Sequence, residues 1–515
     1  MSDKPTSAPT APGAASRPRD PRLDFFRGLA MFIILFAHTP GNSWTLWIPA
    51  RFGFSDATEI FVFCSGMASA IAFGKIFESR GWLLGTARVA FRVWQVYWAQ
   101  IGVVLVTAGM LLLIDRQGWG LEGKVYIETL PLKPLIDDTA AALLGLFTLT
   151  WIPNLFDILP MYLVILAMIP LVMALHRFAG FPAVAVALLA LWLATQMQWT
   201  DLPGRPWNPD IRWFFNPFGW QLVFFTGFAF GMGWLGAPPR DRRLVYLAAA
   251  FVLLTIPFAW HKIHGAIFLP DAWLLHDWIY YARQGINFLW WKSDQGFFRW
   301  LHFLALAYLA WMAVGVAGER LRSGFRPPEP LGRAWLVLAA VVLVLTFPYT
   351  YVETIQTVLP ALHRGIVHMF GTWAPETLGF SLFIQDGRIG LAHLAHLAAA
   401  VVLVWAAIGP RWRAWVVQDG FTAVVPIIRK VGTQSLAVFL MSIPLSRFNG
   451  WVLDMIGREP VTWALVNLGG CAVLIGVAYG VGWIKSQPWR GPRVAPSPPA
   501  PSASIREPAQ PRPAE

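Results

Sequence analysis

Long apolar stretches separated by short polar connections recur along almost the whole chain. A helix needs about 20 mostly apolar residues to cross a bilayer, so the pattern predicts an all-α, polytopic transmembrane bundle of about ten to twelve helices. A further apolar piece, 140–151, is too short to span and is expected to be re-entrant or interfacial. The twelve candidate helices are approximately 25–40, 57–77, 90–114, 159–175, 183–199, 219–235, 244–260, 300–317, 334–347, 389–408, 433–445 and 461–484.

Basic residues are concentrated in alternate connections, on the same side as Arg17, Arg19 and Arg22. Because Lys and Arg favour the cytoplasmic side, both termini are predicted to be cytoplasmic. The other connections are longer and rich in tryptophan, for which two roles stay open: anchoring at the membrane interface, or stacking on sugar rings. These tryptophans are Trp44, Trp47, Trp207, Trp213, Trp273, Trp278, Trp290 and Trp291.

Composition and charge narrow the class of protein further. The chain has 515 residues, 56% of them hydrophobic and 13% charged, which is too apolar for an ordinary soluble protein. The net charge of +12 does not indicate nucleic-acid binding, because the basic residues lie mostly in short connections and tails. Cys64 and Cys471 both lie in apolar stretches, so no disulfide framework is expected.

The first apolar stretch, RLDFFRGLAMFIILFAH, begins with charged residues and ends on His38. Arg27 and His38 are eleven residues apart, so on a helix they share a face within about 20° and lie roughly 16 Å apart along the axis. Asp24 falls on nearly the same face. Either this face carries chemistry through the membrane, or Arg27 is a positive-inside anchor and His38 an interfacial polar residue.

Polar residues in other apolar stretches are weaker candidates. Glu59 precedes a Ser65-Gly66 pair that could permit close helix packing. Arg88 and Arg92 share a helix face and could hold a phosphate, or could be two more anchors. His302 opens a helix from the predicted outer side.

Two motif-like patterns fail on their context. GMGWLG, from Gly231 to Gly236, ends an apolar helix without a preceding strand, so with Gly227 it indicates small-residue packing rather than nucleotide binding. The pairs His261/His264 and His393/His396 lack the further ligands of a metal site, and no bound metal or cofactor is expected.

Several segments, taken in order, resemble the integral-membrane acyltransferase-3 superfamily. They are LDFFRGLA with His38 eleven residues after Arg27, the segment from Glu59 to Gly66, RVAFRVWQVY from Arg88, and GTQSLAVFL from Gly432. Within it the chain is most similar to the OpgC branch, on RDPRLDFFRG, FGFSDATEIFVFCSG, LFDILPMYLV, LHFLALAYL and VGTQSLAVF.

The resemblance implies an acyl transfer from cytoplasmic acyl-CoA, with succinyl-CoA expected for this branch, to a periplasmic glucan. His38 would be the catalytic base, with Arg27 and Glu59 as further catalytic residues. The implied substrate-binding residues are Asp24, Ser65, Arg88, Arg92, Asp157 and His302. Ser442 stands where many acetyltransferases of the superfamily carry a histidine.

The resemblance also divides the chain. It predicts a core region at 20–317, an insertion with two extra helices at 318–430 and a C-terminal part of the membrane domain at 431–485. The Pro- and Ala-rich ends, 1–19 and 486–515, are expected to be disordered. The predicted protein is thus a multi-pass enzyme of a bacterial inner membrane whose partners are lipid, acyl-CoA and a glucan. An O-acetyltransferase for another envelope polysaccharide, and a transporter or flippase without acyl transfer, are the alternatives.

Overall fold

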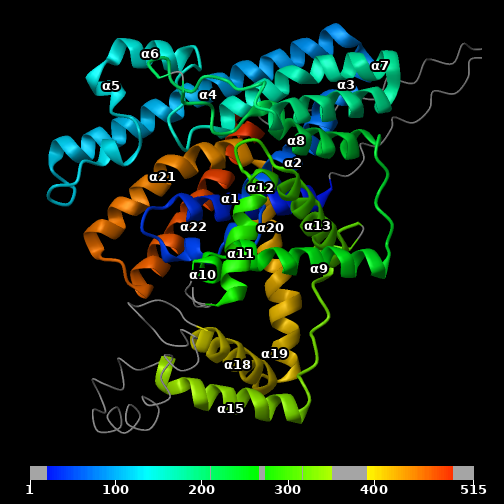
Figure 1. The fold of residues 1–515 in the computed structure, drawn as a ribbon, viewed down its shortest axis with the longest axis vertical. Coiled ribbons are helices and arrows are strands. Elements are labelled where there is room, and N and C mark those ends of the chain that lie inside the picture. Colours follow the sequence, from blue (N-terminus) through cyan, green and yellow to red (C-terminus); the bar gives the residue numbers. More distant parts are fainter. Residues whose placement is uncertain (1–19, 209, 266–272, 316, 351–390, 491–515) are drawn as a thin grey trace, which may run out of the picture.

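The computed structural model describes residues 20–208, 210–265, 273–315, 317–350 and 391–490. All regular elements in this part of the chain are helices, and it holds no β-strand beyond one isolated bridge between Pro203 and Arg212. The main bundle consists of α1 (Pro21–His38), α2 (Ala57–Ser69), α3 (Lys75–Arg80), α4 (Trp82–Gln117), α7 (Ile158–Gln196), α8 (Pro217–Met232), α9 (Arg242–Ala259), α13 (Phe297–Val314), α20 (Phe421–Thr433), α21 (Ser435–Ile456) and α22 (Pro460–Ser486) (Figure 1).

Seven helical stretches in the described residues are long and apolar enough to cross a membrane, or eight if the bent pair Ala395–Ala407 and Pro410–Thr433 forms one span. The prediction of a polytopic helical membrane protein is therefore confirmed. The count of ten to twelve spans and the cytoplasmic position of both termini stay predictions.

Helix α1 lies at the centre of the bundle and packs on α2, α20 and α21. Asp20 caps its N-terminus by accepting from the Arg22 N–H at 2.9 Å, and Pro21 occupies the first turn, where its missing N–H is harmless. A Cβ placed on Gly28 would lie 2.0 Å from the Ile428 carbonyl oxygen, and one on Gly432 would lie 1.8 Å from that of Asp24. The α1–α20 crossing therefore depends on both glycines.

Glycines also set the contact between α2 and α8. A Cβ on Gly66 would lie 1.9 Å from the Phe224 oxygen, and one on Gly227 would lie 2.2 Å from the Phe63 oxygen. Gly231 meets Ala70 in the same way, at 2.7 Å. The small-residue packing interpretation is confirmed for Gly227 and Gly231, whereas a Cβ on Gly233 or Gly236 would meet nothing within 4 Å.

Helix α7 folds back on itself at Gly180. A straight helix of its 39 residues would be about 58 Å long. Asp157, just before α7, and Asp201, just after it, nevertheless line one cavity of about 260 Å³. Gly180, with φ 75° and ψ −179°, is the non-helical residue at which the direction reverses, so the two halves correspond to the predicted helices 159–175 and 183–199.

Shorter helices complete the described chain: α5 (Pro134–Asp137), α6 (Thr139–Phe147), α10 (His261–His264), α11 (Leu274–Gly285), α12 (Asn287–Trp290), α14 (Arg320–Ser323), α15 (Arg333–Thr350), α18 (Leu391–Ala407) and α19 (Pro410–Trp415). Helix α6 occupies the segment judged too short to span. Helices α15 and α18 pack on each other and lie apart from the main bundle, at the bottom of the view (Figure 1).

The predicted boundaries 318–430 and 431–485 are not tested. Residues 351–390 of this segment, the tails 1–19 and 491–515, and the His393 side chain lie outside the described residues. His396 is buried, and its Nδ1 lies 3.0 Å from the Thr346 hydroxyl, which ties α18 to α15.

We expect Gly432→Ala to lower the free energy of unfolding by about 1–3 kcal/mol, because its methyl group would force α20 away from α1. Gly476→Ala in α22 is the matched control, since a Cβ there meets nothing within 4 Å. Thermal unfolding of the purified protein in detergent measures both. Equal melting temperatures for the two variants would contradict the role assigned to this crossing.

Candidate functional site: charged residues at both ends of α1

His38 ends α1 and is held in place through its own backbone. The Arg447 guanidinium on α21 donates through Nη2 to the His38 carbonyl oxygen, which would otherwise be one of the unsatisfied carbonyls of a helix end. The His38 side chain is half-buried, and its Nδ1 has no hydrogen-bond partner among the described residues. The backbone contact thus positions His38, and its Nδ1 stays available for a hydrogen bond to another group.

The loop after His38 is fixed by a pair of buried amides. The Asn42 amide donates to the Asn467 side-chain oxygen at 2.9 Å, and the Asn467 amide donates back at 2.9 Å. Asn42 also accepts from the Trp44 N–H at 3.1 Å and so caps the short helix Ser43–Trp47. The loop therefore leaves α1 along a defined path toward α2.

A capping box starts α2. The Asp56 carboxylate accepts from the Thr58 N–H at 2.6 Å, and the Glu59 Oε2 accepts from the Asp56 N–H at 2.8 Å. The spacing D-x-x-E before an apolar stretch is the sequence signature of this arrangement. It accounts for only one oxygen of each carboxylate. Glu59 is fully buried, and the Asp56 side chain is 12% exposed.

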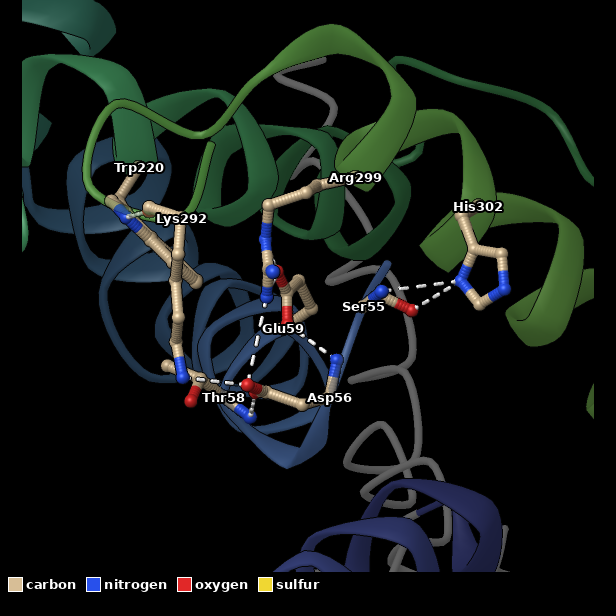
Figure 2. A network of polar contacts seen from close by, with 8 residues as sticks. All are labelled: Ser55, Asp56, Thr58, Glu59, Trp220, Lys292, Arg299 and His302. Carbon is tan, nitrogen blue, oxygen red and sulfur yellow. Dashed lines mark hydrogen bonds and ion pairs between the residues drawn. The ribbon is translucent and has the colours of Figure 1, made fainter. Parts of the chain in front are cut away.

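Two cations from elsewhere in the chain take the remaining oxygens (Figure 2). Arg299, on α13, donates through Nε to the Glu59 Oε1 at 2.8 Å, and its Nη2 lies 2.6 Å from the same oxygen. Lys292 donates to the Asp56 Oδ2 at 2.6 Å, and the Arg299 Nη2 lies 3.6 Å from it. Asp56, Glu59, Lys292 and Arg299 form a buried ion cluster that joins α2 to α13.

The two cations decide the charge of Asp56. Burial alone would raise the pKa of this carboxyl, but the nearby Lys292 and Arg299 outweigh burial and hold its pKa well below the usual range. Asp56 is therefore ionised at any working pH. Arg447, Lys292 and Asp56 are also the charged groups whose fields reach the His38 side chain, so the buried ion cluster and His38 share one end of the bundle.

His302 lies beside the buried ion cluster but faces Ser55 (Figure 2). Its Nδ1 lies 2.7 Å from the Ser55 hydroxyl and accepts from the Ser55 N–H at 3.3 Å. The ring is buried against Gly53, where a Cβ would lie 2.3 Å from the His302 Nε2. The structure thus places this predicted substrate-binding residue where it fixes the loop before α2.

The opposite end of α1 carries basic and polar residues from three other helices. Arg27 donates to the Ser435 hydroxyl, at the start of α21, at 2.5 Å. The preceding residue, Gln434, accepts from Lys485 of α22 at 2.7 Å. The charge of Arg92 on α4 reaches Lys485, so Arg27 and Arg92 approach the same end of the bundle.

The other predicted site residues differ in their exposure and in their contacts. Arg88 is exposed, with its guanidinium 5.8 Å from the centre of the Phe91 ring. Asp24 and Ser65 are buried within the packed faces of α1 and α2. Asp157 caps a turn by accepting from the Leu155 N–H at 3.0 Å, and burial raises its pKa to about 7.

No group of three or more His, Cys, Asp or Glu residues that could hold a metal ion occurs in the described part of the chain. His261 and His264 both belong to the four-residue helix α10.

Sequence reasoning singled out His38, Arg27 and Glu59 but missed Asp56, Lys292, Arg299, Arg447 and Ser435. The D-x-x-E spacing could have found Asp56. Arg299 stands three residues before His302 and shares its helix face. Lys292 and Arg447 give no local signal, because their partners lie 236 and 409 residues away in the chain.

The fold and these charges define a polytopic helical membrane protein with a positioned histidine and a buried ion cluster at one end of its bundle. Residues 19–375 and 326–486 match the family model described as OpgC protein. The chain belongs to the OpgC family, which makes it a membrane acyltransferase that acts in glucan modification. The comparisons with curated proteins and with solved structures found no match.

We expect Arg299→Met to destabilise the fold by about 3–5 kcal/mol, because it leaves the buried Glu59 carboxylate without its cation. Lys133→Met is the matched control, since the pair of Lys133 with Glu128, at 2.9 Å, is exposed and should matter little. Adding Glu59→Gln to Arg299→Met should recover part of the loss. Melting temperatures in detergent measure all three, and an effect of Arg299→Met as small as the control would refute the cluster's structural role.

Proposed function

We propose that the protein is an inner-membrane O-acyltransferase that transfers a succinyl group from cytoplasmic succinyl-CoA to hydroxyl groups of a periplasmic glucan. The family supplies the acyltransferase class and the link to glucan modification. The succinyl donor, the periplasmic acceptor and the inner membrane are our assignments from the resemblance of the sequence to the OpgC branch.

The observation that carries this proposal is the division of charge along α1. Arg27, with Arg92 and Lys485 nearby, makes one end cationic, as an anionic coenzyme requires. His38 lies at the other end, about 16 Å away along the helix. The charged groups of Asp56, Lys292 and Arg447 lie at this same end. A donor bound at the first end can present its thioester toward an acceptor at the second.

In this proposal His38 acts as the general base. It removes the proton of an acceptor hydroxyl while the oxygen forms a bond to the thioester carbonyl carbon. The carbon–sulfur bond then breaks, the acyl group stays on the acceptor as an ester, and the CoA thiolate takes up the proton that His38 carries. Arg447 keeps the imidazole in place through the backbone, and Arg27 holds the donor without itself titrating.

A transporter or flippase without acyl transfer is the main competitor, because a charged helix face also suits a pathway through the membrane. The two functions differ in a direct way. An acyltransferase consumes acyl-CoA and yields CoA and an ester, whereas a transporter moves its substrate without an acyl donor.

We expect His38→Ala to reduce acyl transfer by roughly 10²-fold or more with acyl-CoA affinity largely unchanged, the usual scale for a lost general base. Arg27→Ala should instead weaken acyl-CoA binding, and Arg27→Lys should recover only part of it, because lysine lacks the planar guanidinium. Binding and single-turnover transfer by the purified full chain measure both. Wild-type transfer rates in His38→Ala would show the mechanism to be wrong.

The identity of the acyl group is tested on the product. A succinyl ester leaves a free carboxylate, so glucans from a strain that lacks this protein should carry less negative charge than wild-type glucans. Anion-exchange separation and mass spectrometry of the isolated glucans measure this difference. Loss of acetyl groups with unchanged charge would favour an O-acetyltransferase instead.

A further inference from the structure

The cavity between the two ends of α7 is built from three loops at one end of the bundle. They are the residues before α7, the segment between α7 and α8, and the loop before α13. Its volume is about 260 Å³, close to the lower limit of about 300 Å³ for small-molecule sites. It has room for a single small ring rather than for a lipid tail or a whole coenzyme.

Two tryptophans that do not contact another aromatic ring in the described residues line this cavity. Trp213 and Trp291 make no ring contact with another aromatic residue and no side-chain hydrogen bond within the described part of the chain, and Trp291 is 48% exposed. Trp207, in the same segment as Trp213, instead contacts the Trp151 ring, with 5.8 Å between the ring centroids and an angle of 48° between the ring planes. An indole ring that is not paired with another aromatic ring is suited to contact the apolar C–H face of a sugar ring.

The polar groups of the cavity offer both hydrogen-bond donors and acceptors. Arg205 makes no side-chain hydrogen bond or ion pair with the described residues, whereas Arg212 is paired with Asp201. Asp157 and Asp294 supply acceptors, and burial raises the pKa of Asp294 to about 6. Two arginines against three carboxylates leave the lining close to neutral or slightly negative, which disfavours a polyanion such as CoA.

The loop before α13 connects this cavity to the buried ion cluster. Trp291, Ser293 and Asp294 line the cavity, while Lys292 between them reaches the Asp56 Oδ2 at 2.6 Å (Figure 2). The residues that line the cavity are thus the sequence neighbours of Lys292, one of the charged residues that act on His38. The cavity and His38 lie at the same end of the bundle.

We propose that this cavity is the acceptor subsite of the enzyme and binds one neutral glucose unit of the glucan between Trp213 and Trp291. The inference rests on the proposed function, because it names the part of the molecule that receives the acceptor. Arg205 and Asp294 hydrogen-bond the ring hydroxyls, and the neighbouring glucose unit extends toward His38. The subsite fixes which hydroxyl reaches the base.

The test compares Trp213→Ala and Trp291→Ala with Trp199→Ala as the matched control. Trp199 is 77% exposed, lies in the same part of the chain and does not line the cavity. Binding of linear glucotetraoses of different linkage to the purified full chain is measured by calorimetry, and KM and kcat are measured with isolated glucan as acceptor. Each cavity variant should weaken binding and raise the glucan KM by about tenfold, with a smaller change in kcat and unchanged acyl-CoA affinity.

Asp294→Asn keeps the shape of the side chain and should also raise the glucan KM, which guards against a folding defect of the tryptophan variants. Unchanged KM in Trp213→Ala, Trp291→Ala and Asp294→Asn, with glucan acylation intact, would overturn the subsite and leave the proposed function standing. Displacement of the glucotetraose by CoA or pyrophosphate would also overturn it. If the wild-type protein neither binds nor acylates any glucan, the proposed function itself fails.

Discussion

The buried ion cluster is the constraint on which the His38 end of the site depends. Asp56 and Glu59 begin α2, and Arg299 and Lys292 belong to α13 and the loop before it. Charges removed from water must be paired, so α13 cannot move away from α2 without leaving a carboxylate exposed to an apolar surrounding. The same four residues thereby set the position of the loop that lines the neighbouring cavity, and two of them, Lys292 and Asp56, act with Arg447 on the charge of His38.

Helix α1 is held at both ends and along its side. Arg447 fixes its last carbonyl, Ser435 meets Arg27 near its start, and Gly28 and Gly432 let α20 lie directly against it. Close backbone packing restricts sliding and rotation of the helix, because any change of register would bring side chains into the glycine contacts. The distance between Arg27 and His38 is therefore a fixed property of the bundle.

The sequence predicted those features that local patterns carry. The apolar stretches predicted most helices, Gly227 and Gly231 were correctly interpreted as packing residues, and the segment 140–151 does not form a long helix. Helix α20 was missed because Pro426, Arg429 and Lys430 interrupt its apolar pattern, although one face of it packs on α1. Only the acidic half of the buried ion cluster has a signal in the sequence, because the capping box of Asp56 and Glu59 is a local spacing. Lys292 and Arg299 lie more than 230 residues from these carboxylates, and no short-range rule pairs residues so far apart.

The Asn42–Asn467 pair fixes the chain after His38 with groups that carry no charge, so the position of the histidine does not depend on its protonation state. Two carboxamides hold the chain directly after α1, and neither changes charge within the range in which an imidazole titrates. A salt bridge in the same place would weaken with ionic strength and would respond to the protonation of His38. Because this amide pair is uncharged, the geometry of the turn does not depend on ionic strength or on the protonation of His38, and it would stay constant through the proton transfers that we propose for this histidine.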